Sequence, residues 1–320
     1  MAGEYNGSPV LSAMRLDFII PLYNESAGLR AFHTSLLEAL TSLPHELRFF
    51  YVDDGSTDDT GAILAELARA DRRIQPIALS RNFGHQAALS AGLAAVSGDA
   101  VLMMDGDGQH PPTLAPEMVR LYEAGYDVVQ TQRIDPGGLR FKRASGAAFY
   151  WLINRLGETR IPEGAADFRL LSRDAVNALR QLGEYHRFYR GLVEWIGFRS
   201  VILPYTPSPR LAGRSHYSLR KMLRLAGDGL FSFSLAPLRL ALVIGMLFLL
   251  LLAVEIVYVL SFWLRGTERS LVPGWSSLMI ILTMSSGISM ILLGILGFYV
   301  GMIFQEVKRR PVYVVRPEKR

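Results

Sequence analysis

Residues 101–112 read VLMMDGDGQHPP, in which a short apolar run is followed by two carboxylates and an amide. The apolar run predicts a buried strand, and the glycines and prolines predict that regular structure ends soon after it. If the chain stays extended, Asp105, Asp107 and Gln109 direct three oxygens towards one point. Mg²⁺ takes one or two carboxylates and completes its shell with water and phosphates, so this stretch predicts a metal site. Asp-Gly-Asp-Gly is also ordinary turn chemistry, which is the alternative.

Apolar strands and amphipathic helices alternate on both sides of this stretch. This alternation predicts an α/β fold with a mainly parallel sheet and flanking helices. We expect the regular alternation to stop beyond Arg133. The expected strands are Leu16–Leu22, Leu47–Val52, Ile74–Leu79, Ala100–Met104 and Asp127–Gln132, and the expected helices are Glu25–Leu40, Thr57–Ala70, His85–Val96 and Thr113–Ala124.

Polar clusters follow three of the expected strands, at residues 23–25, 53–56 and 105–107. Ligands of open α/β sheets bind beyond the carboxyl ends of the strands, so these clusters predict one shared pocket. No GxGxxG follows the first strand, which argues against a dinucleotide-binding fold.

Residues 165–172, AADFRLLS, place Asp167 and Arg169 in an otherwise apolar run. A buried ion pair between them is one interpretation. The other is an acid or base that faces the pocket. The sequence leaves both open.

Two long apolar segments lie near the C-terminus. Residues 240–264 contain only Glu255 as a charged residue, and residues 275–304 contain none. Either exceeds the roughly 20 residues that cross a bilayer, and the short connector predicts a transmembrane hairpin. Lys and Arg before the first span and after the second predict that the large domain and both termini are cytoplasmic, at the inner membrane. The expected units are a flexible tail (1–15), a catalytic domain (16–213), a basic amphipathic juxtamembrane segment (214–235), the hairpin (236–305) and a basic tail (306–320).

Composition narrows the function further. The chain has no cysteine, which excludes disulfides, zinc–thiolate sites and cysteine nucleophiles. Its net charge is +5, but the basic residues are dispersed and no nucleic-acid-binding motif accompanies them, so we expect no nucleic-acid partner. The amphipathic helices and glycine-rich spans favour a homo-oligomer.

Six segments carry polar motifs in a particular order: residues 20–25 (IPLYNE), 52–58 (VDDGSTD), 79–84 (LSRNFG), 105–112, 166–171 (ADFRLL) and 213–221. In this order and spacing, the segments resemble family 2 glycosyltransferases of the GT-A fold. More narrowly, they resemble the membrane-anchored polyprenyl-phosphate glycosyltransferases, the group of dolichol-phosphate mannose synthase and bacterial undecaprenyl-phosphate glucosyltransferases. Two positions depart from the family pattern: glycines 106 and 108 interrupt the usual Asp-Ala-Asp-Leu-Gln, and His216 stands where lysine is common.

The resemblance implies an inverting transfer of a monosaccharide from a nucleotide diphosphate sugar to a polyprenyl phosphate at the membrane, for cell-envelope glycan or lipopolysaccharide modification. It implies that Asp105, Asp107 and Gln109 hold Mg²⁺ or Mn²⁺, and that Asp167 and Asp107 are the catalytic residues. It places these residues against the nucleotide and the phosphates: Pro21, Tyr23, Glu25, Asp53, Asp54, Asp105, Arg133, Arg143, Arg210 and Arg214.

Glucose carried by UDP is the first expectation for the donor, with amino sugars and GDP-mannose as alternatives. Because the second pKa of a phosphate monoester is about 6, the acceptor is largely ionised at neutral pH. A strong base is then less necessary, and we expect Asp167 mainly to position groups. The competing hypotheses are a processive polysaccharide synthase, which would need more spans and a Gln-x-x-Arg-Trp-like motif, and a catalytically silent membrane scaffold that binds nucleotide sugar.

Overall fold

A computed structural model describes residues 13–134, 162, 164–185, 187–207, 236–265 and 274–317. The juxtamembrane segment 214–235 and the site residues Arg143, Arg210 and Arg214 lie outside these ranges.

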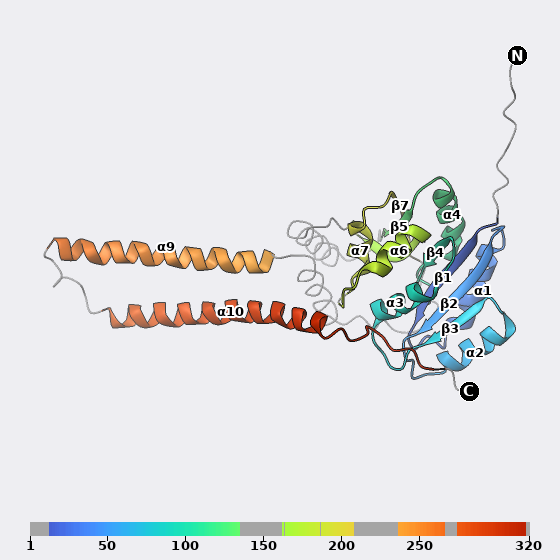
Figure 1. The fold of residues 1–320 in the computed structure, drawn as a ribbon, viewed down its shortest axis with the longest axis horizontal. Coiled ribbons are helices and arrows are strands. Elements are labelled where there is room, and N and C mark those ends of the chain that lie inside the picture. The colour runs from blue at the N-terminus through green and yellow to red at the C-terminus, as the bar shows by residue number, and fades with distance from the viewer. Residues whose placement is uncertain are drawn as a thin grey trace, which may run out of the picture.

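A seven-stranded sheet in the order β3-β2-β1-β4-β6-β5-β7 organises the globular part (Figure 1). Only β6 runs antiparallel to its neighbours, so the sheet is mixed but mostly parallel, as predicted. The strands are β1 (Arg15–Leu22), β2 (Glu46–Asp53), β3 (Ile74–Ala78), β4 (Ala100–Met103), β5 (Val128–Arg133), β6 (Ala165–Ser172) and β7 (Ser200–Tyr205).

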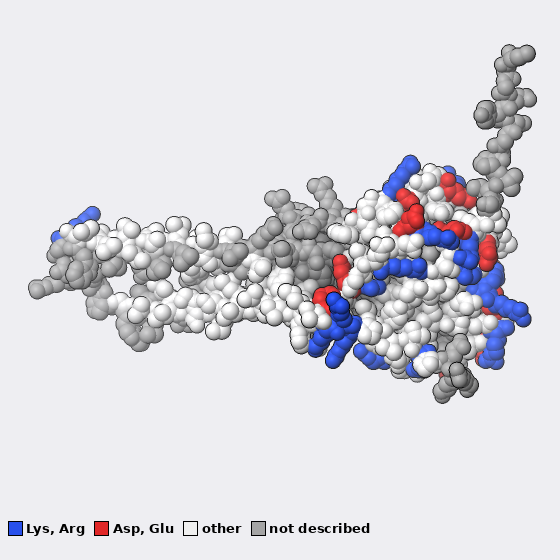
Figure 2. Space-filling view, in the orientation of Figure 1, with Lys and Arg blue, Asp and Glu red and all other residues white. Residues whose placement is uncertain are grey.

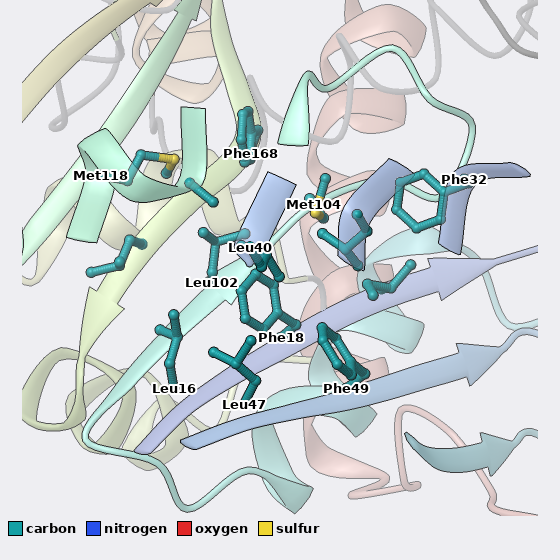
Figure 3. Packing of buried hydrophobic residues seen from close by; sticks show 14 of the residues in the cluster. Leu16, Phe18, Phe32, Leu40, Leu47, Phe49, Leu102, Met104, Met118 and Phe168 are labelled. Carbon is teal, nitrogen blue, oxygen red and sulfur yellow. The ribbon is translucent and has the colours of Figure 1, made fainter. Parts of the chain in front are cut away.

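Helices cover both faces of the sheet because its strands are apolar on both sides. In β1, Phe18 and Ile20 pack with α1, α2 and α4, while Ile19 packs with α3, α6 and α7 on the other face. Figure 3 shows Phe18 and Leu102 among the fully buried side chains of the first core. The helices are α1 (Leu29–Leu40), α2 (Thr60–Ala70), α3 (His85–Ala95), η1 (Pro112–Leu114), α4 (Ala115–Glu123), α6 (Arg173–Gln181) and α7 (Tyr189–Trp195).

The predicted alternation of strands and helices was right up to Arg133, but its predicted end there was wrong. All five expected strands and four expected helices are present, with boundaries shifted by a few residues. The alternation does not stop at Arg133, because β6, α6, α7 and β7 extend the same sheet. The antiparallel strand β6 lies between β4 and β5 and brings its N-terminal residues to the carboxyl ends of its neighbours.

Two long helices, α9 (Ala236–Leu264) and α10 (Trp275–Val307), project side by side from the globular part (Figure 1). Within α10, the 24 residues Met284–Val307 have a mean hydropathy of 2.2 and are long enough to cross a membrane. Figure 2 shows little charge along the visible face of either helix and basic residues where α10 meets the globular part. Met284–Val307 is the one candidate span among the described residues, so the second span stays a prediction.

Candidate active site at the carboxyl ends of the strands

Asp105 and Asp167 come together because β4 and β6 are antiparallel neighbours. Met103 pairs with Arg169, so the same register brings Asp105, two residues after Met103, opposite Asp167, two residues before Arg169. Asp105 is partly exposed, with 35% of its side chain accessible, whereas Asp167 is buried. The antiparallel strand therefore places one carboxylate at the mouth of the site and another behind it.

His85 lies between these two carboxylates. Its Nε2 atom is 3.7 Å from Asp105 Oδ1 and 3.5 Å from Asp167 Oδ2. Desolvation lowers the pKa of His85, but the charge of Asp105 and the hydrogen bond to Asp167 outweigh it and raise the pKa to about 8. Our sequence analysis gave His85 no role. The available signal was a histidine at the first position of the helix that follows a polar strand-end loop.

Asp167 is held by two arginines, which reconciles the two interpretations of its segment. The buried Arg169 donates to Oδ1 at 3.1 Å, and Arg190 donates to both carboxylate oxygens, at 3.2 and 2.9 Å. Arg169 also donates to the carbonyls of Ala166 and Tyr189. Burial would raise the pKa of Asp167, but Arg190, His85 and Arg169 together lower it well below its usual range. Asp167 is thus both part of a buried ion pair and a neighbour of the site, and it is held as an anion.

Residues 105–109 form a turn instead of the extended segment that we expected. Regular strand structure ends at Met103, and Gly108 has φ of +79°, a conformation that L side chains rarely adopt. The Asp107 carboxylate accepts the Gln109 N–H at 3.0 Å, which closes the turn. Gly106 packs against Leu22, so a Cβ there would overlap the leucine side chain. The glycines at 106 and 108 thus allow a tightly packed turn.

His110 holds the backbone of this turn in place. The Asp105 N–H donates to His110 Nδ1 at 2.9 Å, and the ring stacks on Phe168 of β6 with 5.1 Å between the ring centroids. Burial lowers the pKa of His110, which keeps Nδ1 available as an acceptor. A histidine missed by sequence reasoning therefore fixes the backbone at Asp105.

The side-chain oxygens of this turn suit a divalent cation only if substrate oxygens complete its coordination shell. Among the described residues, no group of three or more His, Asp or Glu side chains converges to hold a metal. Asp105 and Asp107 are partly exposed, and the Gln109 Oε1 atom accepts a hydrogen bond from Arg133 at 3.2 Å. Two carboxylates and an amide, with phosphate oxygens and water beyond them, are the chemistry that Mg²⁺ and Mn²⁺ accept. The residues present fit such an ion.

The carboxylate of Asp54 holds the loop that follows β3. Its two oxygens accept the N–H groups of Phe83 and Gly84 at 2.7 and 2.9 Å. Burial raises the pKa of Asp54, while these two hydrogen bonds oppose the change. Asp53, immediately before it, accepts the Ser56 N–H at 2.9 Å and shapes its own turn. Both aspartates are therefore engaged in loop structure at the edge where we predicted a nucleotide.

The remaining predicted residues lie around the same edge. Pro21 is buried within β1, Tyr23 is exposed at the end of that strand, and Glu25 is partly buried beside it. The Glu25 N–H donates to Thr60 Oγ1 at 2.9 Å, which joins the loop after β1 to the start of α2. Arg133, at the end of β5, reaches the 105–109 turn through Gln109. The described site residues thus share one edge of the sheet.

Gly55 lies in the loop after β2 and packs against the loop after β3. It has φ of +67°, and a Cβ would lie 2.6 Å from the backbone nitrogen of Asn82 and closer still to the Arg81 carbonyl carbon. Gly55→Ala is therefore expected to cost about 2–5 kcal/mol, from left-handed strain and from backbone overlap. The thermal unfolding midpoint of the detergent-solubilised chain measures the loss.

Gly197→Ala is the matched control for this prediction. Gly197 has the same φ of +67°, but the nearest atom to its added Cβ is 4.0 Å away. This variant should lose only the strain, about 1–2 kcal/mol. Equal losses in the two variants would contradict close packing between the loops.

Comparisons with known proteins identify relatives of this chain. A family model described as Glycosyl transferase family 2 matches residues 17–180. An uncharacterized glycosyltransferase of Synechocystis is 39% identical over 94% of this chain and 95% of its own. A bactoprenol glucosyl transferase of Shigella phage SfV is 34% identical over 96% of this chain and 99% of its own. A solved mannosyltransferase of Pyrobaculum calidifontis, in complex with GDP-Man and Mn²⁺, is 18% identical over 69% of this chain and 64% of its own, with a TM-score of 0.48, too distant to assign a ligand.

Proposed function

Because the chain belongs to glycosyl transferase family 2, we propose that it transfers a monosaccharide from a nucleotide diphosphate sugar to a polyprenyl phosphate. The observation that carries this proposal is the joining of two features in one chain. Carboxylates, histidines and arginines gather at the strand ends, and a helix long and apolar enough to enter a bilayer follows the same domain. A polyprenyl chain is costly to remove from a membrane, so the enzyme must work where the lipid lies.

The relatives favour glucose as the sugar and an undecaprenyl-type lipid as the acceptor. Several of them are named bactoprenol glucosyl transferase and align over almost their whole length. UDP-glucose is therefore the first donor to test. Transfer with inversion follows from the family resemblance.

In this proposal, Asp105 and Asp107 hold Mg²⁺ or Mn²⁺ against the donor diphosphate. The bound ion would screen the phosphates and stabilise the departing nucleotide diphosphate. Arg133 lies beside the same turn, so its guanidinium can contribute positive charge where the two anionic substrates meet. Arg143, Arg210 and Arg214 remain proposed for the same purpose.

Asp167 is proposed as a positioning residue. Its low pKa and its two arginine partners disfavour proton uptake at neutral pH. The acceptor phosphate is itself largely ionised there, so the reaction needs little help from a base. Asp167 instead orients His85 and Arg190 beside Asp105.

For the membrane, we propose that α9 and α10 form the hairpin predicted from the sequence. The described side chains of α9 are largely apolar and exposed, among them Met246 and Leu250. The basic residues Lys308, Arg309 and Arg310 follow α10, which favours placing the catalytic domain and both termini on the cytoplasmic face. The domain boundaries at 16–213, 214–235 and 236–305 belong to the same proposal.

The test is incubation of the purified full-length chain with a panel of nucleotide sugars, Mn²⁺ or Mg²⁺, and undecaprenyl phosphate. We expect a lipid-linked monosaccharide, made fastest from UDP-glucose. A polymer would instead identify a polysaccharide synthase. No product from any donor would favour the silent scaffold and overturn the proposal.

A further inference from the structure

The chain that follows α10 returns to the catalytic domain and pairs with its sheet. Val315 forms an antiparallel bridge with Leu79, just beyond β3. The Ser80 N–H donates to the Val314 carbonyl at 2.8 Å, and the Arg316 N–H donates to the Ala78 carbonyl at 2.7 Å. Because β3 is an edge strand of the sheet, this segment covers the carboxyl end of that strand, which would otherwise be open. Figure 1 shows the red tail running from α10 towards β3.

Two further contacts fix the tail along its path. Tyr313 is partly buried against the second core cluster, which includes Leu79 and residues of α3 and α7. At the end of α10, the Glu306 carboxylate accepts the Tyr185 N–H at 2.8 Å. By contrast, Val314 and Val315 are each 46% exposed, so the backbone hydrogen bonds and Tyr313 provide most of the attachment.

The tail is attached at the start of the loop that Asp54 holds. Ser80 receives the tail, Arg81 and Asn82 pack against Gly55, and Phe83 and Gly84 donate to Asp54. The loop 80–84 therefore connects the tail to Asp54, the carboxylate that the family resemblance places against the nucleotide.

We infer that residues 311–316 form a strap that positions the loop 80–84 and, through it, Asp54 for nucleotide binding. The nucleotide in this inference rests on the proposed function, whereas the coupling between the tail and the loop does not. Residues 311–316 are then a support for the donor site and connect that site to the end of α10. The strap acts through Asp54, so its residues are positioning residues.

Arg316→Pro and Arg316→Ala form a matched pair. Both remove the guanidinium, but only proline removes the N–H that donates to Ala78. Tyr313→Ala is a second variant that keeps every backbone donor and removes the packing against the core. Hydrogen–deuterium exchange of residues 79–84 and affinity for UDP with Mn²⁺ are measured on the full-length chain in detergent, with the donor KM and kcat from the transfer assay.

We expect faster exchange at residues 80–84 in Arg316→Pro and Tyr313→Ala, with Arg316→Ala like the wild type. Loss of one backbone hydrogen bond should weaken UDP binding and raise the donor KM about threefold to tenfold, with kcat unchanged. Equal exchange in Arg316→Pro and Arg316→Ala would overturn the strap. Faster exchange without weaker UDP binding would overturn its role at the donor site. If the wild type does not bind UDP, that failure counts against the proposed donor, and exchange alone decides the coupling.

Discussion

Asp107→Ala is expected to lower turnover by about a hundredfold to a thousandfold, because it removes one of the two carboxylates proposed to hold the cation that would neutralise the leaving diphosphate. Asp107 is partly exposed at the 105–109 turn, where it accepts the N–H of Gln109, the residue that Arg133 contacts. In the proposed reaction, a phosphate attacks a donor that is itself a diphosphate, so unscreened repulsion opposes the encounter. Affinity for UDP alone should change much less, because the loops after β1 and β2 are untouched.

Asp107→Asn separates the charge from the turn. Asparagine keeps an oxygen that can accept the Gln109 N–H, which the aspartate accepts at 3.0 Å, but it carries no charge. We expect Asp107→Asn to be nearly as slow as Asp107→Ala and to need more Mn²⁺ for half-maximal activity. Near-normal turnover in Asp107→Asn would mean that the residue only closes the turn, and it would remove the metal from the proposal.

The sequence was sufficient to predict the strands and helices up to Arg133, because each of these strands is a compact apolar run and helical patterns separate them. It was also sufficient to place residues 53–54 and 105–107 at one edge, since parallel strands end on the same side. It failed for residues 165–172, where a strand that is buried on both faces has no alternation to distinguish it from a helix. The antiparallel direction of β6, which brings Asp167 to Asp105, has no local signal in the sequence.

The partners of the site residues were even harder to predict from the sequence. Arg190 reaches Asp167 from α7, and His85 reaches it from α3, although 23 residues separate Asp167 from Arg190 and more than 80 separate it from His85. Such contacts depend on tertiary packing, which periodicity and spacing do not encode. Tertiary packing also decides the position of residues 311–316. The sequence predicts a basic tail there, but the segment pairs with the chain at the end of the edge strand β3.

Asp167→Ala is expected to destabilise the chain by about 3–5 kcal/mol, because it leaves a buried guanidinium without its counter-ion. Arg169 is fully buried, and Arg190 is only partly exposed. Asp167→Asn keeps an oxygen acceptor for both arginines and should fold better, yet it loses the anion that orients His85. Its turnover is expected to fall at least tenfold at every pH between 6 and 9, since one lost charge-assisted hydrogen bond is worth about 1.5–3 kcal/mol.

The dependence of stability on pH checks the same ion pair without an activity assay. The folded-state pKa of Asp167 lies well below its ordinary value of 3.8, so the charged form is the one that stabilises the fold. Protonation of His85, whose pKa Asp167 helps to raise to about 8, should increase the advantage of the wild type over Asp167→Asn in unfolding midpoint as the pH falls to about 6. The advantage should then stay constant to about pH 5 and shrink as the pH falls below the ordinary pKa of Asp167. A wild-type advantage that grows as the pH falls below about 6, where His85 is already charged, would mean that Asp167 is protonated in the fold. An Asp167→Asn variant with wild-type turnover across the pH range would show that the residue does not even position its neighbours.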